Sequence, residues 1–317
     1  MPKTFLILVF FLTLLKPHFY SQVSGCKDSL AKNYNPNASK NDGSCEYKKL
    51  KVKAQRFIDL PDEIKETSGL FFWNKLLWTH NDDTDNFIYG IDTATGKITT
   101  KIQLAFLTNS DWEEIRQDEK YMYIGDIGNN YGNRKNLRIY RISKDDIIND
   151  NFKYDTISFS YSLQTDFNST KLNTTNFDCE AFIVLNDSIF LFTKEWTSKK
   201  SSVYILPAKP GKHSAQFKSI LDVNGLVTGA TFIERKNKIM LCGYNTALQP
   251  FLFLIYDFKE NNFTSANKRR IELDLPFHQI EGIEFTEDGK LFLSNEKFSK
   301  SIINTKNKLI TVKWSEF

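Results

Sequence analysis

The sequence predicts an all-β fold, a β-propeller of five four-stranded blades, from three observations. Aromatic residues are abundant, with 27 Phe and 13 Tyr among 317 residues, and helix-favouring runs are scarce. Such a composition suits pleated, half-buried surfaces. From residue 51 onward, short apolar runs alternate with turns, and one strand pattern returns at intervals of about 50 residues, the spacing of propeller blades.

The repeated unit starts with an apolar strand that carries a small or acidic residue near its beginning. This opening strand occurs at 67–71, 112–115, 179–183, 227–232 and 280–285. A second apolar run ends in polar residues, at 76–82, 121–126, 189–195, 239–245 and 291–296. Third strands are predicted at 87–91, 137–142, 203–206, 251–258 and 309–314. Fourth strands are predicted at 98–104, 156–163, 215–221 and 269–275.

The fifth unit ends without a fourth strand, and the N-terminal side of the chain offers one. Residues 55–61 (QRFIDLP) resemble 270–276 (RIELDLP). A ring whose last blade takes up the first strand has no free sheet edge, so we expect a propeller over residues 51–317. Six blades are the alternative if 144–176 contains another blade, but that stretch shows one good strand. A β-sandwich does not explain the repeated opening strand.

Residues 1–21 predict a signal peptide. Lys3 supplies the positive end, and residues 5–15 are almost wholly apolar but too short to span a bilayer. Cleavage after Ser21 fits the preference for small residues at such sites. The alternative is a lipobox at 23–26 (VSGC), in which a lipid on the cysteine anchors the protein to a membrane. Both interpretations predict a secreted or cell-surface protein, and we expect a monomer.

The four cysteines fall into two pairs. Cys26 and Cys45 bracket a short polar stretch, so we expect a disulfide that closes a small segment at 22–50. Cys179 and Cys242 lie within predicted strands, where buried free thiols are the expected state. The charges exclude one class of partner: 42 Lys+Arg accompany 38 Asp+Glu without a dense basic block, so no nucleic acid is expected.

Polar residues recur at equivalent places of the repeat and predict an acidic site at one mouth of the channel. The end of each second strand lies beside the start of the first, because the two strands are antiparallel. Three columns of side chains therefore meet at this mouth. They are Ser68, Glu113, Glu180, Thr228 and Glu281; Glu66, Asp111, Asp178, Leu226 and Gln279; and Asn81, Asp126, Glu195, Asn245 and Glu296.

Carboxylates this crowded need protons or a cation to offset their charge. Carboxylate, hydroxyl and amide oxygens suit Ca²⁺, and the Cys and His spacings do not indicate zinc. We expect the metal ligands to be Glu66, Ser68, Asp111, Glu113, Asp178, Glu180 and Glu281. The alternative is that each acid accepts backbone hydrogen bonds and only holds the blades in register.

Further polar groups suit a small anionic or polar ligand. Arg134, which follows the loop 126–130 (DIGNN), and Lys194 have the charge to hold an anion. The expected ligand-binding residues are Asn81, Asp82, Asn129, Asn130, Arg134, Lys194, Glu195 and Glu296. For an enzyme, the candidate catalytic residues are His80, as general base, and Asp126. The alternatives are an Asn/Gly turn, solvated charges and a histidine that caps a strand.

Several of these motifs resemble a family of bacterial secreted β-propellers, grouped as phytase-like or esterase-like. The likeness covers most of residues 60–300 and does not imply a particular activity. The motifs are SGL at 68–70, WTHND at 78–82, DWEEI at 111–115, GDIGNN at 125–130, DCEA at 178–181, TKE at 193–195 and EG at 281–282.

Two more distant likenesses concern the metal and the N-terminal segment. The strand 280–285 (IEGIEF) is similar to one in the calcium-activated nucleotidases, five-bladed propellers with a central Ca²⁺. That likeness implies cation ligands at Ser68, Glu113, Glu180 and Glu281. Segment 22–50 resembles a Cys-flanked motif of exported proteins from Bacteroidetes-type bacteria.

The sequence thus predicts a secreted, calcium-binding propeller that binds a small anionic or polar ligand. Hydrolysis of a phosphate or carboxylate ester is the enzymatic version, in which the cation polarises the phosphoryl oxygen and orients water. The other version is a non-catalytic binding or adhesion module that Ca²⁺ stiffens.

Overall fold

Strands make up most of the described chain. The structure is a computed structural model that describes residues 22–82, 85–149, 151, 153–300 and 303–313, so the predicted signal peptide at 1–21 lies outside it. The described residues form 25 strands, one short α-helix, α1 (Lys144–Ile148), and two 3-10 turns. The all-β prediction is confirmed. Within these residues, no helix has both the length and the apolar character needed to cross a membrane.

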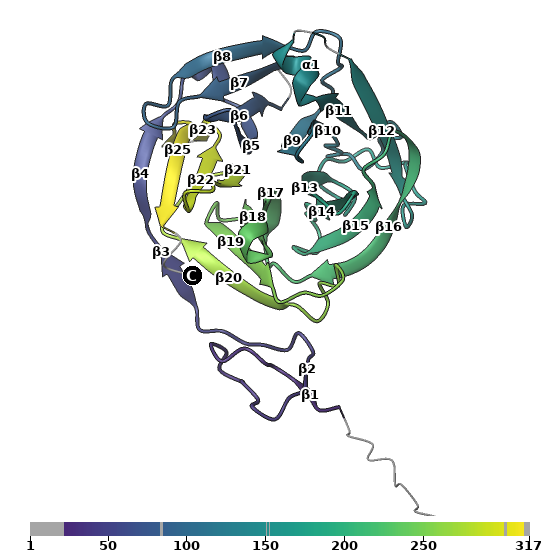
Figure 1. The fold of residues 1–317 in the computed structure, drawn as a ribbon, viewed down its shortest axis with the longest axis vertical. Coiled ribbons are helices and arrows are strands. Elements are labelled where there is room, and N and C mark those ends of the chain that lie inside the picture. The colour runs from purple at the N-terminus through teal and green to yellow at the C-terminus, as the bar shows by residue number, and fades with distance from the viewer. Residues whose placement is uncertain (1–21, 83–84, 150, 152, 301–302, 314–317) are drawn as a thin grey trace, which may run out of the picture.

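Antiparallel four-stranded units radiate from a common axis (Figure 1). Along the chain they are β5 (Thr67–Trp73), β6 (Leu76–Asn81), β7 (Phe87–Ile91) and β8 (Ile98–Gln103); β9 (Trp112–Gln117), β10 (Tyr121–Asp126), β11 (Arg138–Ser143) and β12 (Tyr154–Tyr161); β13 (Cys179–Leu185), β14 (Ser188–Thr193), β15 (Ser201–Pro207) and β16 (Gly211–Leu221); β17 (Leu226–Ile233), β18 (Lys238–Tyr244), β19 (Pro250–Tyr256) and β20 (Asn267–Leu273); and β21 (Ile280–Phe285), β22 (Lys290–Asn295), β25 (Lys308–Lys313) and β4 (Ala54–Asp59).

The opening strands β5, β9, β13, β17 and β21 lie innermost and contact one another in a closed ring. Outer strands join some of the units. The parallel pairing of β12 with β16 links two units, and β3 (Leu50–Val52) pairs in parallel with β20. The strand β4 pairs antiparallel with β25, so the unit that begins at β21 is completed from the N-terminal side of the chain.

The core lies between neighbouring sheets. A central strand such as β19 is covered on both faces, and its residues are buried without interruption from Pro250 to Tyr256. Edge strands show the opposite pattern, since β8 carries mostly half-buried and exposed residues. Sheets buried on both faces hold the ring rigid, which fixes the start of each opening strand relative to its neighbours.

A disulfide between Cys26 and Cys45 closes the N-terminal segment, as expected. This segment, which includes β1 (Ser24–Gly25) and β2 (Lys40–Asn41), packs on the β19–β20 unit. The Asp28 carboxylate accepts hydrogen bonds from the hydroxyls of Tyr47 and Tyr256. The other two cysteines, Cys179 and Cys242, are free and buried.

Candidate functional site: an acidic mouth built on β-bulges

Most of the opening strands lose register with the second strand at the position where the sequence places an acid or threonine. In the second unit, Gly125 pairs with Glu114 and Asp126 pairs with Trp112, so Glu113 has no partner opposite. The pairing skips Glu180, Thr228 and Glu281 in the same way. A β-bulge bends its strand and re-aims the extra side chain. These bulges therefore turn equivalent residues of neighbouring units toward one another.

The first unit departs from this pattern. Ser68 keeps its pairing with His80, and the register shift lies between Ser68 and Phe71. The Ser68 hydroxyl donates a hydrogen bond of 2.7 Å to the backbone oxygen of Glu113. Ser68 thus ties the first opening strand to the second one.

The carboxylates that meet at this acidic mouth are buried and raise one another's pKa. Loss of solvation, followed by repulsion from Glu180, raises the pKa of Glu113 well above its ordinary value. Burial also raises the pKa of Glu180, where the attraction of Lys194 opposes it. Burial raises the pKa of Glu281 to about 7, with partial compensation by Lys194. The mouth therefore favours protons or a cation over free carboxylates.

Lys194 is the cationic side chain in contact with these acids, and its charge is held by Glu180. Its Nζ lies 2.5 Å from Glu180 Oε1, and both side chains are almost fully buried. The aromatic rings of Trp196 and Tyr244 lie 5.2 Å and 5.6 Å from the same nitrogen. Burial opposes the charge, but Glu180 and its acidic neighbours raise the Lys194 pKa above its ordinary value. The single positive charge of Lys194 does not neutralise the negative charge of the surrounding carboxylates.

A deep acidic group consists of Asp111, Glu113 and Asp178. Burial and the charge of Asp178 raise the pKa of Asp111 to about 6. The backbone N–H of Asn129 donates to Asp178 Oδ1 at 2.7 Å, and the Trp196 side chain is close enough to oppose the rise in the Asp178 pKa that burial causes. Asp178 Oδ2 is buried and makes no hydrogen bond of ordinary geometry with the described residues, so it remains available as a ligand atom for a cation.

Gly128 leaves the space beside this group open. A Cβ at this position would lie 2.3 Å from Asp111 Oδ2 and 2.3 Å from Glu113 Oε1. We expect Gly128→Ala to destabilise the protein by about 1–3 kcal/mol, because both carboxylates must move. Urea unfolding measures this change, and an unchanged midpoint would show that the two carboxylates move freely. Gly90→Ala is the comparison, since its Cβ would meet the end of the Leu76 side chain at 2.8 Å and the Trp78 ring at 3.2 Å instead of a carboxylate.

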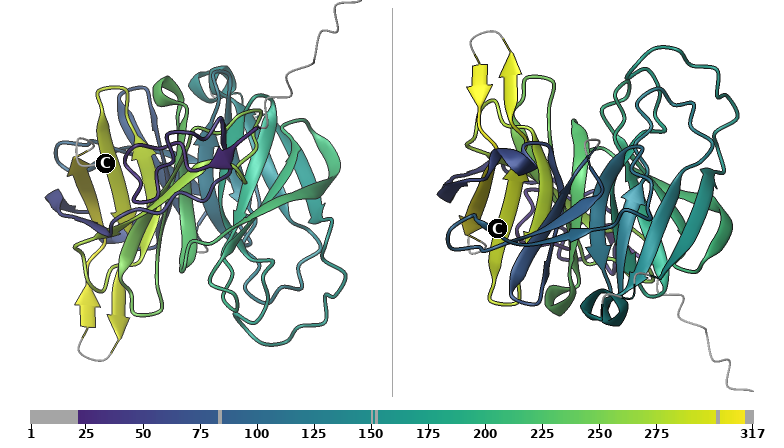
Figure 2. Two further views of the ribbon diagram at one scale, coloured as in Figure 1. Left: turned by 90° about the horizontal axis from the view of Figure 1, so that it is seen from below. Right: turned by 90° about the horizontal axis from the view of Figure 1, so that it is seen from above.

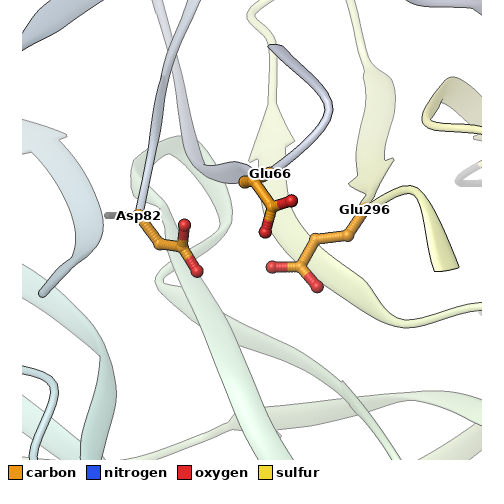
Figure 3. A group of neighbouring side chains, drawn as sticks. All are labelled: Glu66, Asp82 and Glu296. Carbon is orange, nitrogen blue, oxygen red and sulfur yellow. The ribbon is translucent and has the colours of Figure 1, made fainter. Parts of the chain in front are cut away.

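A second acidic group lies at the seam between the first and last units. Glu66 precedes β5, Asp82 follows β6 and Glu296 follows β22, and Figure 3 shows the three carboxylates converging. One oxygen from each lies within 4.8 Å of the others, and all three side chains are half-buried. Burial, followed by the charges of Glu281 and Asp82, raises the Glu296 pKa well above its ordinary value. This acidic triad can hold a metal ion.

Ion pairs and hydrogen bonds of its own side chains hold the loop after β10 in place. Asp126 is buried and forms ion pairs with Arg134 at 2.7 Å and Arg138 at 2.8 Å. Arg134 also donates to the backbone oxygen of Gly128 at 2.6 Å. Asn129 donates to the backbone oxygen of Phe177, and its side-chain oxygen accepts from the Arg134 N–H. These contacts fix the position of the deep acidic group.

The remaining predicted site residues lie beside the mouth. The ring of His80 is fully buried edge-on to Trp112, and burial lowers its pKa to about 4. Asn81 donates to the backbone oxygen of Glu63, and Glu195 accepts from Thr193. Asn130 is half-buried at the start of the turn after β10.

A second ionic cluster, which the pattern of repeats did not indicate, joins opening strands across the ring below the mouth. We call Glu114, Arg116 and Glu284 the plug. Arg116 lies 2.9 Å from Glu114 and 2.8 Å from Glu284, and its exposed fraction is 5%. Glu114 Oε2 also accepts from the backbone N–H of Ala230 at 3.0 Å. The plug joins β9 to β17 and β21, which are not its neighbours in the ring.

Two projecting segments rise on the side of the acidic mouth. One is the hairpin of β23 (Phe298–Lys300) and β24 (Ile303–Thr305), and the other is the long connection between β12 and β13 (Figure 2). Both adjoin the mouth in sequence, since β23 follows Glu296 and the long connection leads into Asp178. The mouth is therefore flanked by loops, as ligand sites on rigid scaffolds commonly are.

Solved structures similar to this chain are β-propellers. The WD40 repeats of RRP9 match with a TM-score of 0.41 and 9% identity, over 83% of this chain and 100% of the other. An oxidoreductase (glucose dehydrogenase) from Thermus thermophilus matches with a TM-score of 0.47 and 9% identity, over 81% and 99%. The intramolecular trans-sialidase from Ruminococcus gnavus gives 0.41 and 10%, over 83% and 59%. No protein-family model and no curated sequence matches the chain. These likenesses concern the fold alone.

Proposed function

We propose that the protein is an extracytoplasmic, five-bladed propeller whose acidic mouth binds a divalent cation, preferably Ca²⁺, and through it a small anionic or polar ligand. The observation that carries the proposal is the acidic triad of Glu66, Asp82 and Glu296, with one oxygen of each within 4.8 Å of the others. The ring of opening strands and the completing strand β4 support the blade count. The disulfide supports an oxidising compartment.

The donor set fits a hard cation. The triad and the deep acidic group offer carboxylate oxygens, which suit the six to eight oxygen ligands of Ca²⁺ better than zinc. Glu281 and Glu180 connect the two groups. The charge of Glu281 raises the pKa of Glu296, and the charges of Asp178 and Glu281 raise the pKa of Glu180. A cation at either group would relieve repulsion throughout the mouth.

The ligand is expected to depend on the cation. Lys194 is held by Glu180, while Arg134 and Arg138 are held by Asp126, so these side chains already have anionic partners. A bound divalent cation would instead attract an anionic oxygen and polarise it. The full burial of His80 favours ligand binding over base catalysis by this residue.

Thermal unfolding of residues 22–317 with Ca²⁺ and after chelation tests the cation site. At a free Ca²⁺ concentration 100 times the Kd, we expect stabilisation by about 2.7 kcal/mol, a rise in Tm of roughly 4 °C. Glu296→Gln should remove the shift if the triad holds the ion, and Glu113→Gln should remove it if the deep group does. Glu287→Gln, at an exposed surface glutamate, is the control and should keep it.

The absence of any Ca²⁺-dependent shift in the wild-type protein would overturn the cation proposal. A screen of phosphate and carboxylate esters then separates the two functional versions. Hydrolysis that is lost in folded Glu113→Gln or Glu296→Gln would make the mouth catalytic. A cation-dependent Tm shift without hydrolysis would mark a binding module.

A further inference from the structure

The ring has a second mouth at the opposite end of the opening strands. A hollow of about 550 Å³ lies there, lined by residues from the far ends of all the opening strands, including Phe71, Gln117, Leu185, Phe232 and Glu284. A hollow of about 640 Å³ adjoins it and shares Gln117, Phe232 and Glu284. The plug separates this far mouth from the acidic mouth, because Arg116 belongs to both the plug and the hollow.

Two buried polar atoms at the far mouth lack partners among the described residues. They are Arg116 Nε, which is a donor, and Gln117 Oε1, which is an acceptor. Each unsatisfied group of this kind is costly, because it has lost its hydrogen bonds to water without gaining others. A hydroxyl group both donates and accepts, so a ligand rich in hydroxyl groups can satisfy both atoms.

The walls of the two hollows also carry aromatic side chains on which an apolar ligand face can pack. Phe72, Trp73 and Phe232 are half-buried and line the two hollows, which leaves part of each ring open to a ligand. Aromatic faces with a few fixed polar groups are typical of small-molecule sites, and the volumes lie within the usual range of about 300–1,000 Å³.

Charge at the rim narrows the ligand class. Glu119, Glu234 and Glu287 line the far mouth and are exposed. Glu287 has Arg235 as an ion-pair partner, and both of these side chains are largely exposed to solvent. Lys144 and Lys290 also line the hollows, so the rim carries both signs of charge with acids in excess. This excess of acids repels anions, and a neutral ligand is favoured over an acidic one.

We propose that the far mouth binds a neutral saccharide. Arg116 Nε and Gln117 Oε1 are closed to solvent in the free protein, so both side chains turn toward the sugar hydroxyls on binding. The apolar face of a sugar ring packs on Phe232 or Phe72. Hydration alone is the competing explanation, because waters can also satisfy both atoms. This site is independent of the proposed cation site, since the plug lies between them.

Intrinsic fluorescence tests the proposal, because Trp73 lines the far mouth. Residues 22–317 are titrated with cellotetraose, maltotetraose, xylotetraose, mannotetraose and chitotetraose, and with tetragalacturonate as the anionic comparison. We expect saturable binding of at least one neutral sugar and at least tenfold weaker binding of the anionic one. Trp73→Phe should remove the optical signal, and calorimetry should still detect binding to that variant.

Gln117→Leu removes the orphaned acceptor at nearly constant volume, together with the hydrogen bond from Gln117 Nε2 to the backbone oxygen of Phe72, and we expect at least a tenfold rise in Kd. Phe232→Ala removes an aromatic ring from the wall of the far mouth and should also weaken sugar binding. This variant replaces Gln117→Leu as the test if Gln117→Leu does not fold. Phe217→Ala, an exposed aromatic on β16, and Glu113→Gln, at the acidic mouth, should bind as the wild type does. Binding of none of the neutral sugars, or unchanged affinity in folded Gln117→Leu and Phe232→Ala, overturns the proposal. Loss of binding in Glu113→Gln also overturns it, because the sugar would then belong to the acidic mouth.

Discussion

Replacing Arg116 by Met is expected to destabilise the protein by about 3–5 kcal/mol, the cost of breaking a buried ion pair from one side. Arg116 is the shared partner of Glu114 and Glu284, and it also donates to the backbone oxygen of Ile283 at 2.8 Å. Burial raises the pKa of Glu114 to about 8, and Arg116 opposes this rise. Without the guanidinium, both carboxyls must take up protons to remain buried.

The destabilisation should therefore depend on pH. Protonation of Glu114 and Glu284 is easy at about pH 5 and costly at about pH 8, so the loss from Arg116→Met should be larger at the higher pH. Urea unfolding at both pH values measures this difference. Combining Arg116→Met with Glu114→Gln and Glu284→Gln should recover part of the loss, because no buried acid then remains unpaired.

A matched control is available on the surface. Arg235 and Glu287 form an ion pair whose side chains are 72% and 87% exposed. Arg235→Met should change the free energy of unfolding by no more than about 0.5 kcal/mol. If Arg116→Met proved as harmless as Arg235→Met, the plug would not hold the opening strands together.

The repeat could be predicted because short-range patterns of apolar residues and turns determine where its strands begin. The opening strands begin at Thr67, Trp112, Cys179, Leu226 and Ile280, within one residue of the expected starts. Apolar runs between turns give these positions without any knowledge of distant contacts. The completing strand β4 was also foreseen, from its likeness to the end of the β20 unit. The parallel strand β3 and the hairpin β23–β24 were not, because they are short and carry little periodicity.

The acidic mouth could be predicted because its members recur at equivalent positions of a repeat. Stacking the repeats brought Glu113, Glu180 and Glu281 together, and the structure shows that bulges occur at these residues. The bulges themselves had no recognised signal. The metal and ligand assignments at the mouth remain predictions.

The plug escaped the sequence analysis for a physical reason. Glu114 alternates with Glu113 on the opening strand β9, and none of the three columns of side chains includes it. Glu114 contacts Ala230 and Arg116 contacts Glu284, and both partners lie on strands that face β9 across the channel and are far from it in sequence. Contacts across the axis follow from the closure of the ring, which no local pattern encodes. The signal was the unusual run of charge in 113–116 within a strand that must be buried.

The stability of the metal-free protein is expected to fall as the pH rises from 4.5 to about 7, because burial raises the pKa of Glu281 from 4.5 to about 7 on folding. The folded state therefore binds the Glu281 proton more tightly than the unfolded state does. The stabilisation is fully present below the unfolded pKa and is lost as the pH rises to the folded pKa. Because one pKa unit corresponds to about 1.4 kcal/mol, Glu281 alone contributes about 3 kcal/mol to this change. Asp111, with a pKa raised from 3.8 to about 6, changes stability in the same direction over a lower range.

Chelated protein, unfolded by urea at intervals between about pH 4 and pH 8, gives the required profile. Glu281→Gln cannot titrate, so its profile should be flatter than that of the wild type by about 3 kcal/mol across this range. Glu287→Gln, at an exposed position, should leave the profile unchanged. Added Ca²⁺ should flatten the wild-type profile as well, because a cation replaces the protons that the crowded carboxylates otherwise require. Parallel profiles for the wild type and Glu281→Gln would mean that Glu281 is already ionised in the folded protein over this pH range. In that case Lys194 and the hydrogen-bonding side chains around Glu281 would already offset the negative charge of the acidic mouth. The crowding of carboxylates would then no longer be a reason to expect a bound cation.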